Sequence, residues 1–456
     1  MSEIISINPY TTEEISHYPT VSDQQIEKAI DISNEAFSSW RRTSMVNRSD
    51  LLLKASEILL SKKDSLGKTM VSEMGKPLTQ AIAETEKCAW VCRYYAENGE
   101  RFLADKEVET GNKKSFVAFK PLGVVLAVMP WNFPLWQVFR FAAPTLMAGN
   151  TAILKHASNV PACAKAIEEI FSEAGFPDGV FTTLLAKSDQ VSGIIGNSHI
   201  KAVTLTGSEH AGIAIAGTAG RNLKKSVLEL GGSDPYLILE DADLKHAAEQ
   251  CVTSRMQNNG QSCIAAKRFI LVESVYDEFM KYFKAEMDKY IMADPMQPDT
   301  LLGPMARHDL RDELHGQVKV SVQKGAQLVC GGYIPDHPGA MYPATILANV
   351  QPGMPSWDEE LFGPVASVIK VKDEKEAITI ANITDFGLGA AVFTQDLEKG
   401  ERIAANELHA GACFVNSFVK SDPRLPFGGI GKSGYGRELS EFGILEFVNI
   451  KSVCID

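Results

Sequence analysis

The sequence predicts an α/β protein with two units built on parallel sheets, and three observations lead to this prediction. The chain has 456 residues, which is too long for one compact core. Hydrophobic residues make up 45% and charged residues 22%, the balance of an ordinary globular protein with a large core. From about residue 120 onward, short apolar segments alternate with helical ones. Such alternation is typical of parallel sheets covered by helices on both faces.

The first hundred residues are predicted to be mainly helical. Ser22 and Gln25 fit a capping box, and apolar residues then recur at helical spacing. The segment 48–73 continues this pattern, with residues such as Leu52 and Leu59 on one face. A helical layer therefore precedes the first sheet.

Two series of strands follow, separated at Gly231–Gly232. The first series is predicted at 123–130, 151–155, 181–185, 202–207 and 226–230, and the second at 235–240, 268–273, 326–332, 364–371, 389–394 and 411–416. Segments 112–120 and 447–456 also alternate like strands but fit neither series. Because isolated strands must pair, they predict an arm that joins a sheet of this chain or of a second subunit. The predicted units are 1–100 with 121–230, then 231–428, with 101–120 and 440–456 as the arm.

Charge and terminal sequence exclude several function classes. The net charge is −12, and no basic run interleaved with aromatic residues is present, so nucleic acid is not an expected partner. No apolar stretch reaches the ~18 residues that span a bilayer, and the N-terminus lacks a signal peptide pattern. We therefore expect a cytoplasmic protein that does not enter a membrane.

The eight cysteines do not form a metal or disulfide pattern. They are scattered, with no C-x-x-C pair and no matching histidine spacing, so neither a metal site nor a disulfide framework is expected. Cys88 and Cys92 stand four residues apart in a helical segment, which is typical of packed small hydrophobic residues.

Three residues have the chemistry for covalent carbonyl catalysis. Cys263 follows a Gly-Gln-Ser turn, Glu229 ends a strand before two glycines, and Asn132 lies between two prolines. They offer a nucleophile, a general base and an oxyanion donor. Each has an ordinary alternative as well, since a single cysteine is usually buried filler, a single glutamate is usually solvated, and Asn beside Pro usually forms a turn.

Eight motifs in order give the sequence a resemblance to the NAD(P)-dependent aldehyde dehydrogenase superfamily over essentially its whole length. They are PWNFP (130–134), AGNTAILK (148–155), VTLTGS (203–208), LELGGSDP (228–235), NNGQSC (258–263), EELFGPV (359–365), VN (415–416) and PFGGIGKSGYGRE (426–438). The resemblance implies an aldehyde dehydrogenase-like fold. Its Rossmann-like cofactor domain, α/β catalytic domain and β-strand oligomerisation arm match the three predicted units in that order.

The resemblance also implies the catalytic roles. Cys263 corresponds to the nucleophile that forms a thiohemiacetal and then a thioester, and Asn132 would hold the oxyanion with the backbone N–H of Cys263. Glu229 corresponds to the base that activates water. Its presence argues for a free carboxylic acid product and against transfer to coenzyme A.

The same resemblance implies a cofactor site for NADP or NAD. Its residues are Trp131, Lys155, Gly207, Ser208, Gly212, Glu360 and Phe362. A helix N-terminus after Gly207 suits a pyrophosphate. Relatives often carry a glutamate where this chain has Ser158, and a carboxylate there would repel a 2′-phosphate. NADP is therefore expected to be accepted, alongside or in preference to NAD.

Substrate choice rests on fewer residues. Arg140 stands where succinate-semialdehyde dehydrogenases carry an arginine that binds the distant carboxylate. Their second arginine is replaced by Gln257, and Ser421 or Arg424 is expected to supply the missing contact. Three segments, 140–164, 302–315 and 438–449, resemble a short bacterial subgroup of succinate-semialdehyde dehydrogenases. The assembly that the family resemblance implies is a homodimer or homotetramer.

Other functions are less consistent with these residues. Another semialdehyde or an aliphatic or aromatic aldehyde is the first alternative substrate. A non-enzymatic descendant would be expected to have lost Cys263, Glu229 or Asn132, and a thiol hydrolase would need a partner histidine motif that is missing. Ala265 replaces a second cysteine found in redox-regulated relatives, so no disulfide switch is expected in this loop. Cys263 is expected to be partly thiolate near neutral pH, aided by bound cofactor or a helix N-terminus.

Overall fold

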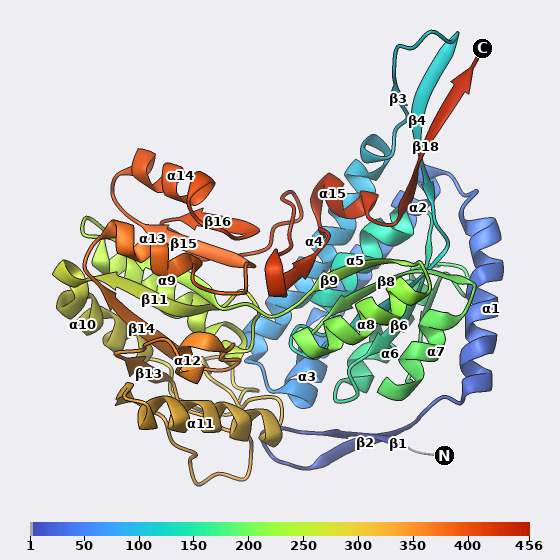
Figure 1. Cartoon of the computed structure of the whole chain (residues 1–456). Helices are drawn as coiled ribbons and strands as arrows, with labels where there is room; N and C mark the ends of the chain where they lie inside the picture. The colour runs from blue at the N-terminus through green and yellow to red at the C-terminus, as the bar shows by residue number, and fades with distance from the viewer. Residues whose placement is uncertain (1–2) are drawn as a thin grey trace.

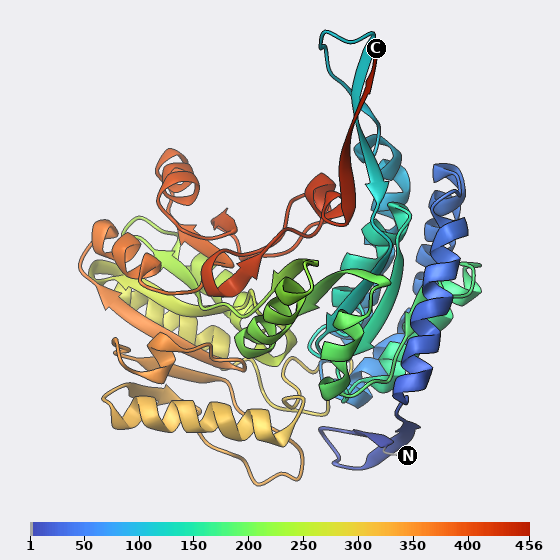
Figure 2. The ribbon, with the colours of Figure 1, turned by 45° about the vertical axis from the view of Figure 1, so that its right-hand side comes forward.

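A computed structural model of the chain describes residues 3–456 and contains two main sheets that stand side by side, each flanked by helices (Figure 1). A narrow ribbon of strands projects away from them and carries the C-terminus (Figures 1 and 2). The α/β prediction is confirmed. Among residues 3–456, no helix is long and apolar enough to cross a membrane.

A hairpin and four helices form the N-terminal part. The hairpin was not predicted, because its two short strands are stabilised by distant contacts, including a 3.0 Å hydrogen bond from Ser6 Oγ to Glu73. The capping box of Ser22 and Gln25 is confirmed at the start of α1. These elements are β1 (Glu3–Ile7), β2 (Glu14–Pro19), α1 (Asp23–Trp40), α2 (Met45–Ser61), α3 (Lys63–Met74) and α4 (Leu78–Phe102).

The first sheet has six strands in the order β17-β9-β8-β5-β6-β7, parallel except for β17. Along β5, Val124 and Leu126 face the core shared with α1, α7 and α8, whereas Val125 and Ala127 face the core on the opposite side. Both faces are buried, which explains the continuous apolar run. The elements are β5 (Val124–Met129), α5 (Trp136–Met147), β6 (Thr151–His156), α6 (Pro161–Glu173), β7 (Phe181–Thr183), α7 (Val191–Gly196), β8 (Ile200–Thr206), α8 (Glu209–Arg221), β9 (Lys225–Glu229) and β17 (Gly434–Tyr435).

The second sheet has seven strands in the order β12-β13-β14-β11-β10-β15-β16, parallel except at β12. Its β13 was not predicted. The elements are β10 (Asp234–Ile238), α9 (Leu244–Met256), β11 (Ala266–Val272), α10 (Tyr276–Met287), α11 (His308–Gln323), β12 (Gln327–Cys330), β13 (Thr345–Ala348), α12 (Pro355–Asp358), β14 (Val365–Val371), α13 (Glu374–Asn382), β15 (Gly389–Phe393), α14 (Leu397–Asn406) and β16 (Ala412–Val415).

The two strand-like segments that fitted neither series pair with each other. Strands β4 (Lys114–Pro121) and β18 (Val448–Ile455) are antiparallel along their whole length, and β3 (Lys106–Glu107) adds a short edge. Helix α15 (Ser440–Leu445) leads into β18. The ribbon extends beyond the body of the chain (Figure 2), as the predicted arm requires.

Asn150 joins this arm to the first sheet, and we predict that its loss destabilises the chain. Its buried side chain accepts from the N–H groups of Leu122 and Gly123 and donates to the carbonyl of Phe447 at 2.9 Å. Because Asn150→Ala leaves these buried groups unpaired, stability should fall by about 2–4 kcal/mol, measured as a lower urea midpoint. Asn47→Ala, at an exposed position of α2, is the control, and equal midpoints for the two variants would contradict this role.

Candidate active site

The loop before Cys263 is fixed in a rare backbone conformation. After α9, Asn258 and Asn259 both have left-handed φ angles, 55° and 57°. Asparagine adopts this region more readily than most residues. The Asn258 amide donates to the carbonyls of Asn132 and Gln261 at 2.7 and 3.0 Å. The NNGQSC sequence therefore folds into a loop that is held by its own buried amides.

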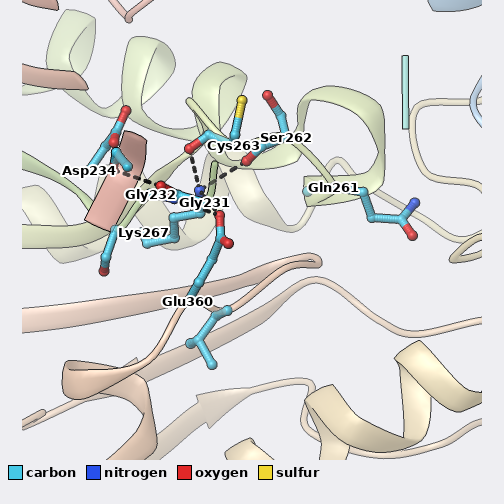
Figure 3. A network of polar contacts seen from close by, with 12 residues as sticks. Gly231, Gly232, Asp234, Gln261, Ser262, Cys263, Lys267 and Glu360 are labelled. Carbon is cyan, nitrogen blue, oxygen red and sulfur yellow. Dashed lines mark hydrogen bonds and ion pairs between the residues drawn. The ribbon is translucent and has the colours of Figure 1, made fainter. Parts of the chain in front are cut away.

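A buried lysine fixes the same loop from the other side. Lys267, in β11, donates to the carbonyls of Ser262 and Cys263 at 2.9 and 2.6 Å. Its ammonium also lies 3.0 Å from Glu360 Oε1, which accepts from the N–H of Gly232 at 3.0 Å. The sulfur of Cys263 points away from this ammonium (Figure 3). Lys267 therefore orients the backbone of the cysteine and leaves its thiol free.

Two cavities meet at Cys263, which lines both. The α4–α5 cavity has a volume of about 330 Å³ and is lined by Gln80, Ala83, Glu84, Lys87, Phe133, Trp136, Gln137, Arg140, Thr253, Gln257, Ser262, Ile264, Tyr290, Phe418, Lys420, Ser421 and Phe427. The α8–α11 cavity has a volume of about 280 Å³ and is lined by Pro130, Trp131, Asn132, Thr206, Gly207, Ser208, Leu230, Gly231, Leu310, Glu313, Leu314, Gln317, Glu360 and Phe362. The half-buried thiol is thus accessible from two chambers.

The α8–α11 cavity brings together most of the residues that the sequence assigned to a cofactor. It is located beyond the carboxyl ends of β5, β8 and β9, where ligands bind in open α/β sheets. Trp131 and Phe362 form an edge-on aromatic pair with ring centroids 5.9 Å apart. Gly207 and Ser208 precede α8, and the Ser208 side chain caps that helix.

These residues fit a dinucleotide. Gly207 and Ser208, which directly precede the 13-residue α8, line the cavity, so the N-terminus of this helix lies beside the space where a pyrophosphate would bind. A Cβ on Gly231 would lie 2.2 Å from Glu360, so glycine lets that carboxylate lie against the cavity floor. Gly207, Ser208, Trp131, Glu360 and Phe362 would therefore hold the cofactor.

Three other residues assigned to the cofactor do not line this cavity. Ser158 lines a separate cavity of about 490 Å³ beside the N-terminal hairpin. Lys155 is buried near the end of β6, and burial lowers its pKa. Gly212 packs against Leu230. A Cβ at position 212 would lie 2.6 Å from the Leu230 side chain, so the glycine lets α8 approach β9 closely.

Of the predicted carboxylate-binding residues, two line the α4–α5 cavity and one does not. Arg140 and Ser421 line the α4–α5 cavity. Arg424 does not, because Asp422 holds its exposed guanidinium through contacts of 2.9 and 2.7 Å. Arg140 forms a buried ion pair with Glu438, and its guanidinium carbon lies 4.7 Å from the centre of the Phe427 ring.

Glu229 lies in a buried cluster with Arg140 and Glu438 and lines neither cavity. Among residues 3–456, its carboxylate oxygens have no hydrogen-bond partner. Burial, followed by the charge of Glu438, raises the pKa of Glu229 well above its usual range, although Arg140 opposes the shift. The surroundings of Glu229 therefore favour the protonated form of its carboxyl.

Burial raises the pKa of the Cys263 thiol to about 12, although the charges of Lys267 and Arg140 oppose the shift. Along the chain, Cys263 lies between a 3-10 turn and β11, so it does not itself begin a helix. The expectation of a thiolate near neutral pH is therefore not met by the chain alone. Bound cofactor is one of the two aids expected from the sequence.

No role was predicted for Lys267, Lys87 or Glu438. A lysine inside the apolar run that becomes β11 was a signal for Lys267, since buried lysines need partners. Gln80, Glu84 and Lys87 recur at helical spacing and share the α4 face that lines a cavity. Glu438 lies at the end of a quoted motif, but its pairing with Arg140 depends on the tertiary fold.

Comparisons with known proteins agree with this geometry. Residues 1–453 match the model of the aldehyde dehydrogenase family. The chain is 49% identical to a probable succinate-semialdehyde dehydrogenase (NADP+) of Synechocystis sp., and the match covers 99% of each chain. It is 46% identical to a succinate semialdehyde dehydrogenase (NAD(P)+) of Escherichia coli, covering 99% of this chain and 98% of the relative. A crystal structure of succinic semialdehyde dehydrogenase from Streptococcus pyogenes in complex with NADP+ superposes with a TM-score of 0.97, at 38% identity and 99% coverage of both chains.

The raised pKa of Cys263 predicts a specific reactivity profile. Without ligands, the rate of alkylation of Cys263 by iodoacetamide should increase with pH from 6 to 10 without reaching a plateau, because the thiol remains protonated throughout. Mass spectrometry of the Cys263 peptide measures this rate, and the exposed Cys454 is the internal control. A plateau below pH 8 would show that the chain alone stabilises the thiolate.

Proposed function

Because the chain belongs to the aldehyde dehydrogenase family, we propose that it oxidises succinate semialdehyde to succinate with NADP, through a thioester on Cys263. One observation carries this proposal. The same thiol lines a cavity suited to a dinucleotide and a second cavity whose wall includes Arg140 and Ser421. A semialdehyde with a carboxylate at its far end fits a chamber with a nucleophile and a guanidinium in its wall. The relatives named for this substrate support the choice.

Cys263 acts first in the proposed reaction. Its thiol loses its proton to solvent, its sulfur forms a bond to the aldehyde carbon, and the carbonyl oxygen becomes an oxyanion. Asn132, which lines the cavity beside Cys263 and donates to the Gln261 carbonyl at 3.1 Å, has a second amide N–H for this oxyanion. Collapse of the oxyanion expels a hydride from that carbon and leaves a thioester on the sulfur. The cofactor, when bound, supplies the acceptor for this hydride.

Glu229 acts in the second step. Water attacks the thioester carbon, Glu229 removes a proton from that water, and the carbon–sulfur bond breaks to release the carboxylic acid and restore Cys263. The base must be ionised for this, whereas burial, followed by the charge of Glu438, raises the pKa of Glu229 and favours its protonated form. Glu229 therefore limits the rate at low pH.

NADP is proposed as the physiological cofactor. Relatives at 46–49% identity are named for NADP+ or for NAD(P)+. A glutamate at the position of the exposed Ser158 would repel a 2′-phosphate, and serine does not. Use of NAD as well remains compatible with these residues.

We propose that the β4–β18 ribbon joins subunits in a homodimer or homotetramer. It projects from the body of the chain (Figure 2) and exposes Ile450 and Ile455 at 62% and 48%. Exposed apolar residues on a strand ribbon favour pairing with a second copy. A cytoplasmic location stays a prediction.

A substrate panel tests the proposed activity. With NADP, succinate semialdehyde should exceed butanal and benzaldehyde in kcat/KM by at least about tenfold, the contribution of one charge-assisted hydrogen bond. Reduced cofactor is measured by absorbance at its nicotinamide band. If uncharged aldehydes are preferred, the alternative of an aliphatic or aromatic aldehyde dehydrogenase replaces this proposal. Cys263→Ala should abolish turnover while cofactor binding, followed by protein fluorescence, is retained.

Replacement of Glu229 should separate the two steps. Glu229→Gln is expected to retain a first-turnover burst of reduced cofactor and to lose about 10²–10⁴-fold of the steady-state rate, since removal of a general base slows only thioester hydrolysis. In the unmodified enzyme, kcat should increase with pH as Glu229, whose pKa is raised, loses its proton. The variant should lack that dependence. A burst lost together with the steady-state rate would assign Glu229 to the first step instead.

A further inference from the structure

The wall of the α4–α5 cavity contains a cation that the sequence comparison did not single out. Lys87, in α4, lines this cavity together with Cys263 and Arg140. Its ammonium donates to Ser421 Oγ at 2.7 Å and lies 4.3 Å from the centre of the Trp136 ring. Two groups from different parts of the chain therefore hold Lys87 in one position.

No acidic side chain of the cavity wall neutralises Lys87. Glu84 is the acidic residue among the lining residues, but it forms a buried ion pair with Lys76. Glu84 also accepts from the N–H groups of Leu135 and Trp136 at 2.9 Å each, at the start of α5. Its carboxylate is therefore fully engaged in fixing the cavity wall.

Arg140 differs from Lys87 in this respect. Glu438 pairs with Arg140 in the buried cluster that also includes Glu229, so the cavity gains little net charge from the guanidinium. Lys87 retains its charge without an acidic partner in the wall. Burial, followed by the nearby charge of Arg140, lowers the pKa of Lys87 to about 8, a cost that a bound anion would offset.

We propose that Lys87, oriented by Ser421, supplies the second carboxylate contact of this enzyme and so replaces the arginine that is absent at Gln257. This inference rests on the proposed oxidation of succinate semialdehyde. In it, the aldehyde carbon lies at Cys263, and the distal carboxylate accepts hydrogen bonds from the Lys87 ammonium and the Arg140 guanidinium. The Lys87 ammonium is positioned by helix α4 and by its hydrogen bond to Ser421. The second contact therefore does not require an arginine near the nucleophile.

Lys87→Met tests this contact, because methionine keeps the apolar stem on Trp136 and removes the charge. The KM for succinate semialdehyde should increase by roughly 10- to 100-fold with a small change in kcat, since the lost hydrogen bond is the same in ground and transition states. The kcat/KM for butanal should stay within about twofold. Lys87→Arg should recover part of the loss.

Lys420→Met is the matched control. Lys420 lines the same cavity, but it is exposed and lies over the Phe418 ring at 5.6 Å. The Lys420→Met substitution removes one positive charge but no donor that the structure holds in place. The KM of this variant for succinate semialdehyde should therefore change by less than about threefold. Equal increases in KM for the two variants would show that the positive charges attract the substrate in general, and would overturn a specific contact with Lys87.

Failure of this inference is distinguishable from failure of the proposed function. If the unmodified enzyme prefers uncharged aldehydes, the function itself is wrong. If it prefers succinate semialdehyde and Lys87→Met leaves that preference intact, Lys87 is not the contact while the function stands. If Lys87→Met lowers kcat/KM equally for butanal and for succinate semialdehyde, Lys87 has a structural role. If Lys87→Met does not fold, Lys87→Gln is compared in the same way. Ser421→Ala should also increase the KM for succinate semialdehyde, but by less than Lys87→Met does.

Discussion

The site depends on one buried ammonium. Lys267 donates to two successive carbonyls of the nucleophile loop and pairs with Glu360 from a distant segment (Figure 3). A buried lysine without partners would be strongly unfavourable, so the loop and the carboxylate must stay where they meet it. Because Lys267 lies in β11 and Glu360 precedes the neighbouring β14, the pairing of these strands sets the distance between nucleophile and cofactor cavity. The Lys267–Glu360 ion pair thus holds the nucleophile loop and the wall of the cofactor cavity in place relative to the second sheet.

The charges around Cys263 are arranged differently on its two sides. Toward the α8–α11 cavity, Glu360 is balanced by Lys267, and the N-terminus of α8 offers backbone N–H groups. Toward the α4–α5 cavity, the acidic residues pair with buried cations, and a lysine is left unbalanced. The first arrangement suits a pyrophosphate held by backbone, and the second suits a carboxylate held by side chains. The same thiol therefore meets two anionic ligands through different kinds of contact.

The sequence predicted the sheets closely, because strands buried on both faces are continuous apolar runs. The predicted 364–371 and the observed β14 differ by one residue, whereas β13 and β17 were missed, and the two residues of β17 are too few to show an alternating pattern. Motifs located Cys263 and its loop, where a Cβ on Gly260 would lie 2.3 Å from the carbonyl carbon of Gly363. Contacts between distant segments, such as Lys87 with Ser421, follow only from tertiary packing, and no local pattern encodes them.

Burial of the two catalytic groups has a common physical consequence. Burial raises the pKa of both Cys263 and Glu229, so the unliganded chain favours the neutral form of each. A neutral thiol and a neutral carboxyl need no counter-charge, which allows both to lie close to the same buried Arg140 cluster without a large desolvation cost. Each must lose a proton only at its own step, the thiol before attack and the carboxyl before water is activated. The charges that favour ionisation are already in the protein, Lys267 and Arg140 for the thiol and Arg140 for the carboxyl, but burial outweighs them in the unliganded chain.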